Sequence, residues 1–313
     1  MHAIIAHTDI DGVAAAAVYL YLTGTQEYKL FFTEPFLLHR ALERVSSAYY
    51  DQVVIIDLGI NPLVYEKVLN YISLLRKHDI EVSWYDHHVW EDAWTNDLTG
   101  LGVRLLLDRS TCATGVVANY AMSTRLGTEN DFVRELVKGV CAGDLWTFDH
   151  WLGPYYIRLV RRGDKDPWRK HVVSVFTSGK YWSSEFESKV EEHISKELSV
   201  LSSKSSQNLV VRSVSGLKIV VAESSSEVEN SFLASYMLGR LNADIVVLVA
   251  DDGKLSFRSR GINIRDLALR LGGGGHLYAS GAKVEIPRLI KLFTKISRKI
   301  LLNYIAELVV RCI

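Results

Sequence analysis

The sequence predicts an α/β protein: an N-terminal domain on a parallel β-sheet, a long linker helix, and a smaller α/β C-terminal domain. Apolar, β-branched runs alternate with helical segments up to about residue 150, which is the pattern of βαβ units. A long amphipathic segment and a second, different set of strands and helices complete the 313 residues. Because this length exceeds one usual domain, we expect domains at 1–184 and 208–313, joined by a helix over 185–207.

In the N-terminal domain, strand-like runs and helical segments follow one another in turn. Strands are expected at residues 3–6, 29–33, 52–57 and 81–86. Helices are expected at residues 12–22, 36–46, 62–77, 116–122 and 131–140. Pro62 opens the third helix, at a position where the missing N–H has no intrahelical partner to lose.

Acidic residues and histidines stand directly after apolar segments in this domain. They are His7, Asp9, Asp11, Asp57, Asp86, His87, His88 and Asp144. Open α/β sheets place their sites at the carboxyl ends of the strands, so these side chains are expected around one point. Carboxylates packed this closely would repel and take up protons, whereas divalent cations hold them ionised. The pattern therefore predicts a metal centre.

Residues 146–182 interleave aromatic with basic side chains. The aromatic residues are Trp146, Trp151, Tyr155, Tyr156, Trp168, Tyr181 and Trp182, and the basic ones are Arg158, Arg161, Arg162, Lys165, Arg169, Lys170 and Lys180. Aromatic faces beside cationic groups are typical of single-stranded nucleic acid binding. A helical layer with its aromatic residues in the core and its basic residues in water fits equally well. Both interpretations stay open.

The second half begins with apolar residues spaced three and four apart over 185–206, which predicts one long helix that ends in serine-rich residues 202–206. Strands are expected at 208–213, 217–222, 245–250 and 254–260, and helices at 231–241, 265–271 and from Pro287 onward. The second of these helices leads into Gly272–Gly275 and His276. Consecutive glycines let a backbone approach a phosphate with its amides pointing inward, and a structural turn is the alternative.

Composition narrows the function classes. With 36 basic and 36 acidic residues the formal net charge is zero, so any attraction for phosphate must be local. The three cysteines, Cys112, Cys141 and Cys312, are widely separated, which argues against a cysteine zinc site and favours a reducing compartment. No signal-peptide pattern and no apolar run of about 18 residues is found, so we expect a soluble, cytoplasmic protein without membrane association.

The order of the motifs resembles the DHH phosphoesterase family with its DHH-associated C-terminal domain. The matching motifs are His7-x-Asp9-x-Asp11-Gly12, Asp57, Asp86-His87-His88, Asp144 and Gly272-Gly273-Gly274-Gly275-His276. Each motif alone is weak, but five in this order are strong, and they cover nearly the whole chain. The family includes RecJ-like exonucleases, oligoribonucleases and cyclic-dinucleotide phosphodiesterases. Leu145 and Trp146 depart from the Thr-Asp-Thr type of sequence that bacterial relatives often have here.

The resemblance implies a site for two divalent cations in the cleft between the domains. The implied ligands are His7, Asp9 and Asp57 for one cation, and Asp11, Asp57, His87 and Asp144 for the other. Asp86 would be a further ligand or would orient a histidine. Carboxylate and imidazole ligands without thiolate favour Mn²⁺, with Mg²⁺ or Co²⁺ as alternatives. The implied catalytic set is Asp9, Asp11, Asp57, His87 and His88.

The resemblance also implies residues that bind the substrate. In the N-terminal domain, His88 is expected to contact a phosphate. In the C-terminal domain, Arg258 matches the family's Ser-x-Arg-Ser strand and is expected to clamp a phosphate. The remaining implied contacts are Gly273, Gly274, Gly275 and His276.

The implied activity is metal-dependent phosphodiester hydrolysis on short single-stranded RNA or DNA, releasing mononucleotides, which the aromatic and basic segment favours. The alternative is a phosphodiesterase for cyclic or linear dinucleotides or for nucleoside bisphosphates. A third interpretation, an inactive Cdc45-like replication scaffold, would require loss of ligands, whereas every expected ligand is present. The sequence leaves the oligomeric state open and is compatible with a homodimer.

Overall fold

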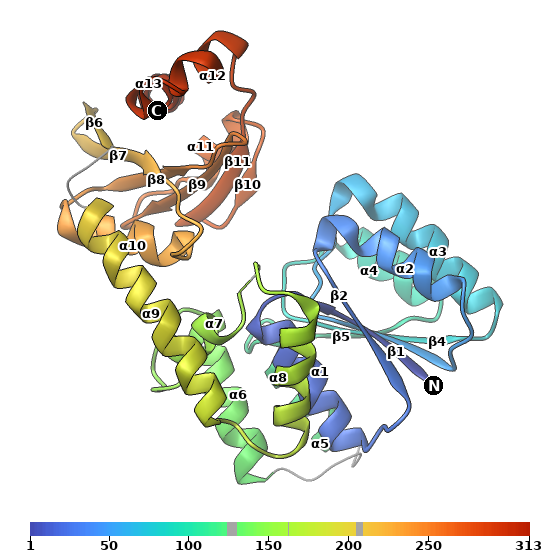
Figure 1. Ribbon diagram of the computed structural model, residues 1–313. Helices are drawn as coiled ribbons and strands as arrows, with labels where there is room; N and C mark the ends of the chain where they lie inside the picture. Colours follow the sequence, from blue (N-terminus) through green and yellow to red (C-terminus); the bar gives the residue numbers. More distant parts are fainter. Residues whose placement is uncertain (124–129, 162, 205–208) are drawn as a thin grey trace. The chain divides into compact units, whose positions relative to one another are not determined.

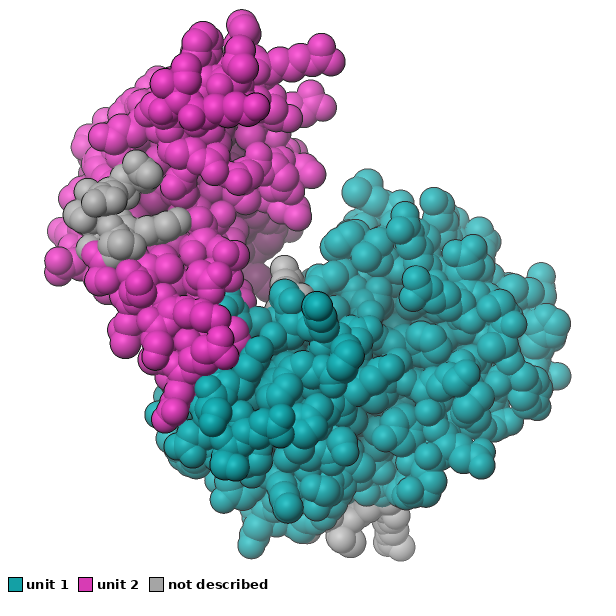
Figure 2. Space-filling model, viewed as in Figure 1, with its two compact units in different colours: residues 1–190 teal, residues 191–313 magenta. Residues whose placement is uncertain are grey.

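The computed structural model describes residues 1–123, 130–161, 163–204 and 209–313. They form two compact units, residues 1–190 and 191–313 (Figure 2). The division falls within helix α9 (Ser184–Lys204), so each unit contains part of this helix. The predicted boundary at residue 207 lies outside the described residues. No described helix is both long enough and apolar enough to cross a bilayer.

Unit 1 is organised around the predicted parallel sheet. Its strand order is β2 (Tyr28–Thr33), β1 (His2–His7), β3 (Gln52–Ile56), β4 (Glu81–Asp86) and β5 (Arg104–Leu107). Strand β1 pairs in parallel with both β2 and β3. The order of strands therefore reverses beside β1, and the carboxyl ends of β1 and β3 flank the topological switch point at which such sheets bind ligands.

Helices cover both faces of this sheet (Figure 1). One face carries α2 (Leu38–Ser46), α3 (Tyr65–Lys77) and α4 (Asp92–Gly100), whose apolar residues share a core with alternate residues of β1, β3 and β4. The short 3-10 helices η1 (Pro35–Leu37) and η2 (Pro62–Val64) lead into α2 and α3. The other face carries α1 (Ile10–Thr23) and α5 (Ala113–Ser123). Burial on both faces explains the continuous apolar runs of the strands.

Helix α1 begins immediately after β1, within the first polar motif. Its N-cap is Asp9, whose side chain accepts a hydrogen bond from the amide of Gly12 (3.2 Å). A Cβ on Gly12 would stand 2.6 Å from the carbonyl oxygen of His7, so only glycine allows the helix to start this close to the strand. This close approach fixes Asp9 and Asp11 beside His7.

Three helices follow in unit 1: α6 (Asp131–Asp144), α7 (Gly153–Leu159) and α8 (Asp166–Thr177). Tyr156 lies fully buried and packs edge-to-face on Phe176, which packs in the same way on Phe186 of α9. Four other aromatic residues of the segment are exposed: Trp146, Trp151, Tyr155 and Tyr181. Each interpretation of residues 146–182 therefore holds for part of the aromatic set.

The basic residues of the same segment divide in a similar way. Lys165, Lys170 and Lys180 are exposed. Arg169, by contrast, is only 2% exposed, and Arg161 is also buried. The expectation that all of these cations face water or a nucleic acid is wrong for these two arginines. Arg162 lies outside the described residues.

Unit 2 contains a mixed sheet with the order β10 (Gly274–Gly275), β11 (Ala279–Lys283), β9 (Lys254–Ser259), β8 (Ile245–Val249), β7 (Leu217–Glu223) and β6 (Leu209–Val214). Strands β7 and β8 are parallel, and the other pairs are antiparallel. Helix α10 (Asn230–Arg240) shares one core cluster with β7 and β8. Helices α11 (Arg265–Arg270) and α13 (Arg298–Arg311) share another, built on alternate strand residues.

The described structure adds elements that the sequence analysis did not predict. Helix α4 and the four-residue strand β5 lie between the predicted elements of unit 1, and β11 follows the glycine motif in unit 2. The helix expected from Pro287 onward is divided into α12 (Arg288–Thr294) and α13. Residues 140–143, the apolar segment before Asp144, belong to the end of α6, so Asp144 comes to the site from a helix and not from a strand end.

Candidate metal centre

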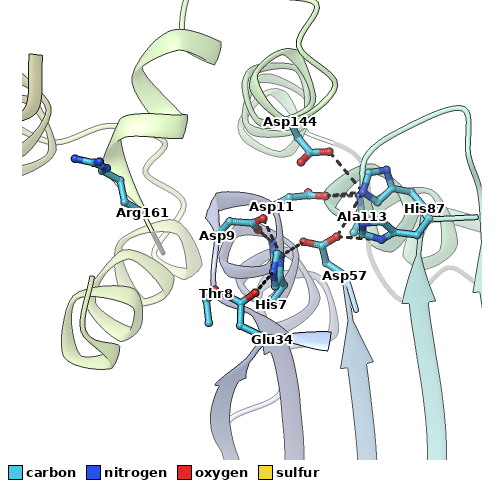
Figure 3. Close-up of polar contacts among 12 residues, drawn as sticks. His7, Thr8, Asp9, Asp11, Glu34, Asp57, His87, Ala113, Asp144 and Arg161 are labelled. Atoms are coloured by element: carbon cyan, nitrogen blue, oxygen red, sulfur yellow. Dashed lines mark hydrogen bonds and ion pairs between the residues drawn. The ribbon is translucent and has the colours of Figure 1, made fainter. Parts of the chain in front are cut away.

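The end of β1 and the start of α1 bring His7 and Asp9 against Asp57, which follows β3 (Figure 3). Nδ1 of His7 lies 2.7 Å from Oδ2 of Asp9 and 3.4 Å from Oδ2 of Asp57. His7 and Asp57 are buried. The ligand atoms of these three side chains all lie within 4.8 Å of one another, close enough to hold one metal ion.

His87, from the turn after β4, is the centre of a second group. Its Nε2 lies 3.5 Å from Oδ1 of Asp57, 3.5 Å from Oδ2 of Asp144 and 3.8 Å from Oδ2 of Asp11. Asp11, His87 and Asp144 also meet the distance criterion for a metal ion. Asp57 directs one carboxylate oxygen toward each imidazole, so it stands between the two groups (Figure 3).

The backbone conformation of Asp57 places its carboxylate between the two imidazoles. Its φ of 58° is in the left-handed region, and its amide donates to the carbonyl oxygen of Tyr85 (2.9 Å). Aspartate and asparagine tolerate this region better than most other residues with a Cβ. The chain therefore turns at the end of β3 while the carboxylate stays at the switch point.

The carboxylate of Asp11 is held by the N-terminus of α5. It accepts hydrogen bonds from the amides of Ala113 (2.7 Å) and Thr114 (2.8 Å) and from the hydroxyl of Thr114 (2.6 Å). The partial positive charge of a helix N-terminus stabilises an anion there. These donors orient the carboxylate of Asp11, although burial raises its pKa. The sequence did not indicate that Thr114 would contact this carboxylate.

Asp86 has a different environment from the other acids. One of its oxygens lies 2.8 Å from Nδ1 of His88, and the other accepts a hydrogen bond from the indole of Trp90 (2.6 Å). Asp86 belongs to none of the groups of described residues whose ligand atoms meet the distance criterion. Of the two roles expected for it, the geometry favours orienting a histidine over binding a metal, and that histidine is His88.

The buried acids of the centre have perturbed pKa values. Burial raises the pKa of Asp57 well above its usual range, and the charges of Asp11 and Asp9 raise it further. Burial and the same neighbouring carboxylates raise the pKa of Asp144 as well. Burial by itself would lower the pKa of His7, but the charge of Asp9 and the close approach of the carboxylates of Asp57, Asp9 and Glu34 outweigh it and raise that pKa. Without a cation, the site therefore retains protons.

The donor set fits a divalent cation. Nδ1 of His7, Oδ2 of Asp57 and Oδ2 of Asp144 are buried without a hydrogen-bond partner among the described residues. Buried polar atoms without partners are costly. A cation held by His7, Asp9 and Asp57 would satisfy the first two atoms, and a cation held by Asp11, His87 and Asp144 would satisfy the third. Imidazole and carboxylate are also the ligands that Mn²⁺ and Mg²⁺ sites use, although imidazole is less suited to Mg²⁺.

Two further residues position the first motif, and the sequence analysis assigned neither to the site. Glu34 follows β2 and lies 3.4 Å from Nε2 of His7, while its other oxygen accepts a hydrogen bond from the hydroxyl of Thr8. Arg169 of α8 donates from Nε to the carbonyl oxygen of Thr8 (2.7 Å). Glu34 carried the same signal as the others, a carboxylate after an apolar run. The sequence around Arg169 gave no such signal, because its hydrogen-bond partner is the backbone carbonyl oxygen of Thr8, which is far away in the sequence.

A disulfide joins two of the elements that carry the site. Cys112, just before α5, is bonded to Cys141 of α6, with their Cα atoms 5.1 Å apart. Residues 113 and 114 hold Asp11, and Asp144 lies in the last turn of α6. The expectation of reduced cysteines is wrong for this pair. The wide spacing of cysteines in a sequence does not show which pairs the fold brings together.

In unit 2, Arg258 of β9 is held by neutral partners. Its guanidinium donates to the hydroxyl of Ser231 (2.6 Å) and to the carbonyl oxygen of Phe257 (2.9 Å). Burial lowers its pKa. Among the described residues, no carboxylate pairs with this largely enclosed cation, which leaves its charge available for an anion.

The backbone conformation around residues 272–275 requires glycine at most positions of the motif. Gly272 ends α11 with a φ of 73°, and Gly275 has a φ of 137°. A Cβ on Gly273 would stand 2.0 Å from the carbonyl oxygen of Gly281. The structural explanation thus accounts for three of the four glycines. Gly274 differs, since a Cβ there meets nothing within 4 Å.

His276 follows the motif and is exposed. Its amide donates to the carbonyl oxygen of Ala279 (2.8 Å), and its own carbonyl oxygen accepts a hydrogen bond from the hydroxyl of Ser280 (2.7 Å). This turn fixes the backbone of His276 and leaves its imidazole at the surface of unit 2.

Comparison with known proteins gives one family match and one short sequence match. Residues 207–301 match the model of the DHHA1 domain. A stretch of 35 residues is 54% identical to the bifunctional oligoribonuclease and PAP phosphatase NrnA of Mycoplasma pneumoniae. That stretch covers 11% of this chain and 11% of NrnA.

Solved structures share the fold over almost the whole chain. Exonuclease RecJ bound to manganese has a TM-score of 0.60 at 17% identity, with 97% of this chain and 90% of RecJ covered. PggH, a pGpG-specific phosphodiesterase from Vibrio cholerae, has a TM-score of 0.58 at 15% identity, with 98% and 99% covered. CDC45 from Entamoeba histolytica has a TM-score of 0.58 at 7% identity, with 100% and 95% covered. Residues 207–301 are therefore identified as a DHHA1 domain, and almost the whole chain shares its fold with RecJ and PggH.

Proposed function

We propose that the protein is a metal-dependent phosphoesterase that hydrolyses short single-stranded oligonucleotides and releases mononucleotides. The observation that carries the proposal is the buried carboxylate of Asp57 between two imidazoles, with an acid from another element beside each imidazole. This arrangement fits two adjacent divalent cations with one bridging carboxylate. Such a pair is used to cleave phosphate esters.

We assign His7, Asp9 and Asp57 to one cation and Asp11, Asp57, His87 and Asp144 to the other. Two of the groups that meet the distance criterion support this assignment. Mn²⁺ is the proposed ion, because the set combines imidazole with carboxylate, and Mg²⁺ and Co²⁺ are the alternatives. When bound, the two cations would supply the positive charge that activates water and stabilises the charge developing on the phosphate oxygens.

The protein's own groups have separate tasks in this proposal. Nδ1 of His88 is hydrogen-bonded to the carboxylate of Asp86, so Nε2 is the ring nitrogen that remains to donate to a phosphate oxygen. Burial would lower the pKa of His88, but the hydrogen bond to Asp86 and the charges of Asp86 and Asp57 raise it, which favours the donating form. In unit 2, Arg258, the amide of Gly274 and the imidazole of His276 bind phosphate or the terminal nucleotide.

A second candidate is hydrolysis of dinucleotides or nucleoside bisphosphates by the same centre. The names of two similar proteins support it: PggH is pGpG-specific, and NrnA is described as both an oligoribonuclease and a PAP phosphatase. The fold shared with CDC45 is the reason to retain an inactive scaffold as a third candidate. The complete set of acids and histidines supports the enzyme over the scaffold.

The test is Mn²⁺-dependent release of mononucleotide from a panel of substrates. The panel contains 5′-labelled RNA and DNA from two-mers to long single strands, cyclic and linear diadenylates, and 3′-phosphoadenosine 5′-phosphate. Turnover that depends on oligonucleotide length supports the first proposal, and turnover confined to dinucleotides or the bisphosphate supports the second. A chelator should abolish either activity. Absence of turnover with Mn²⁺, Mg²⁺ and Co²⁺ would reject both and favour the scaffold.

A further inference from the structure

The turn that follows α6 has an unusual backbone for its sequence. Trp146 has a φ of 61° and Phe148 a φ of 50°, both in the left-handed region. The turn is closed by hydrogen bonds from the amide of Trp146 to the carbonyl oxygen of Gly143 (3.2 Å) and from that of Phe148 to Ala142 (3.0 Å). Bulky residues rarely adopt this conformation, and such strain persists where the surrounding structure enforces it, often at functional sites.

The strained turn presents an aromatic surface. The rings of Trp146 and Phe148 lie edge-to-face with their centroids 4.6 Å apart, and Trp146 remains 39% exposed. Tyr156, a few residues later, is fully buried in the core. Core packing therefore explains Tyr156 but not the strained and exposed Trp146.

The position of Trp146 relates it to the metal centre. It lies two residues after Asp144, so the two Cα atoms are at most about 7.6 Å apart. Oδ2 of Asp144 in turn lies 3.5 Å from Nε2 of His87. A phosphate held at this side of the centre would bring the nucleoside attached to it within reach of the indole.

We propose that Trp146, supported by the edge of Phe148, is the platform on which a nucleobase next to the bound phosphate stacks. This inference rests on the proposed function and adds that the site selects phosphate esters carrying a base. Stacking on an indole is tolerant of base identity, because every base has a π-face. We therefore expect weak discrimination among the four bases and strong discrimination against a ribose phosphate that lacks a base.

The test compares adenosine 5′-monophosphate with ribose 5-phosphate, which share the sugar and the phosphate. Calorimetric titration in Mn²⁺ measures the Kd of each for the wild type, W146A and W146F. We expect W146A to bind the nucleotide about tenfold more weakly and ribose 5-phosphate unchanged, since loss of one stacked base weakens binding by roughly 5- to 150-fold. W146F should retain most of the affinity, because it keeps a ring at the same place.

Tyr49→Ala is the matched control. Tyr49 is 83% exposed and lies just before β3, at the amino end of the sheet, so its loss should not change either Kd. Equal nucleotide binding by the wild type and W146A would overturn the inference, and so would an equal loss for both ligands, which indicates a structural role.

The hydrolysis assay separates this inference from the proposed function. Suppose that the wild type cleaves dinucleotides and that W146A loses about tenfold in kcat/KM only for substrates that carry a base. The hydrolysis proposal and the stacking inference are then both supported. If the wild type cleaves nothing and W146A still loses nucleotide affinity selectively, the hydrolysis proposal fails while the stacking site stands.

Discussion

At the scale of single residues, Asp57 combines the features on which the proposed metal centre depends. It is buried, its two oxygens face different imidazoles, and its backbone adopts a left-handed conformation that few residue types tolerate. Substitutions that change its charge without changing its backbone preference therefore separate chemistry from folding.

Asp57→Asn should leave the protein folded and reduce hydrolysis by more than about a hundredfold, because even the loss of a group that only orients a ligand costs 10–100-fold. Asparagine accepts the left-handed conformation, and removing one buried charge relieves repulsion from Asp11 and Asp9. Thermal unfolding and Mn²⁺-dependent turnover are measured side by side.

Asp79→Asn is the control for this substitution. Asp79 has the same φ of 58° but is exposed in the connection between α3 and β4. Its replacement should alter neither stability nor turnover. Turnover near the wild-type rate in Asp57→Asn would show that Asp57 does not bridge two cations.

The glycine motif allows a second prediction at this scale. Gly273→Ala should destabilise unit 2 by about 1–3 kcal/mol, since its Cβ would meet the backbone of Gly281 and residue 282. Gly274→Ala should fold normally, because its Cβ enters open space, but weaken substrate binding by crowding the amide that we assign to phosphate. Urea unfolding and KM measure the two effects. Normal KM in Gly274→Ala would remove this amide from the substrate site.

Residues that stand after apolar runs could be found from the sequence, because a parallel sheet gathers its strand ends at one edge. This explains why His7, Asp57 and His87 come together as expected. The hydrogen-bond partner of each side chain could not be predicted in this way. Asp86 pairs with His88 and Trp90, and Arg169 with the carbonyl oxygen of Thr8. These pairings depend on differences in atomic position of about a few tenths of an ångström, which only the packed fold determines.

At the scale of elements, α5 and α6 carry the part of the site that comes from outside the strands. The N-terminus of α5 fixes Asp11, and the last turn of α6 presents Asp144. The Cys112–Cys141 disulfide joins these helices where both reach the centre. Their relative position therefore affects the distance between two proposed ligands of one cation.

Reduction of this disulfide, or the double change Cys112→Ser with Cys141→Ser, should lower stability and weaken metal binding. For the sequence separation of 29 residues, losing the constraint that the disulfide places on the unfolded chain should cost about 3.6 kcal/mol, or lower Tm by roughly 7–14 °C. The Mn²⁺ concentration for half-maximal stabilisation should rise as well. Cys312→Ser is the control, since Cys312 is a free thiol in unit 2. An unchanged Mn²⁺ requirement after reduction would uncouple the disulfide from the centre.

Long elements with strong patterns, such as α1, α3, β4 and α9, could be predicted because their apolar residues recur over many positions. Strands β5 and β10 could not, since runs of four and two residues carry too little pattern. Strand β10 consists of glycines, and its pairing with β11 comes from the fold of unit 2.

At the scale of the whole molecule, the protonation of the centre links stability to pH. Asp57 and Asp144 have folded pKa values above the ordinary 3.8, so the metal-free folded state loses stability as pH rises from about 4 through those values. His7 has a folded pKa above 6.5, and the stability it contributes is present below 6.5 and lost as pH rises through the folded value. All three groups act in the same direction.

The stabilisation by Mn²⁺ should therefore increase with pH, because the cation replaces protons that the metal-free site retains. We expect the difference in Tm between Mn²⁺ and chelator to grow from about pH 5 to about pH 8. Thermal unfolding at constant ionic strength measures it, and Asp57→Asn should reduce both the difference and its pH dependence. A difference independent of pH would contradict the assignment of these groups as ligands.

Helix α9 has a consequence for how this protein could be divided or recombined. Phe186 and Val190, in its first half, are buried in unit 1, whereas Val200 and Leu201 pack against a core cluster of unit 2. A fragment cut at the division between the units would end in the middle of a helix and expose apolar residues at the cut. Exchange of the C-terminal domain between relatives should therefore succeed only at a junction beyond Lys204, with the helix inherited whole.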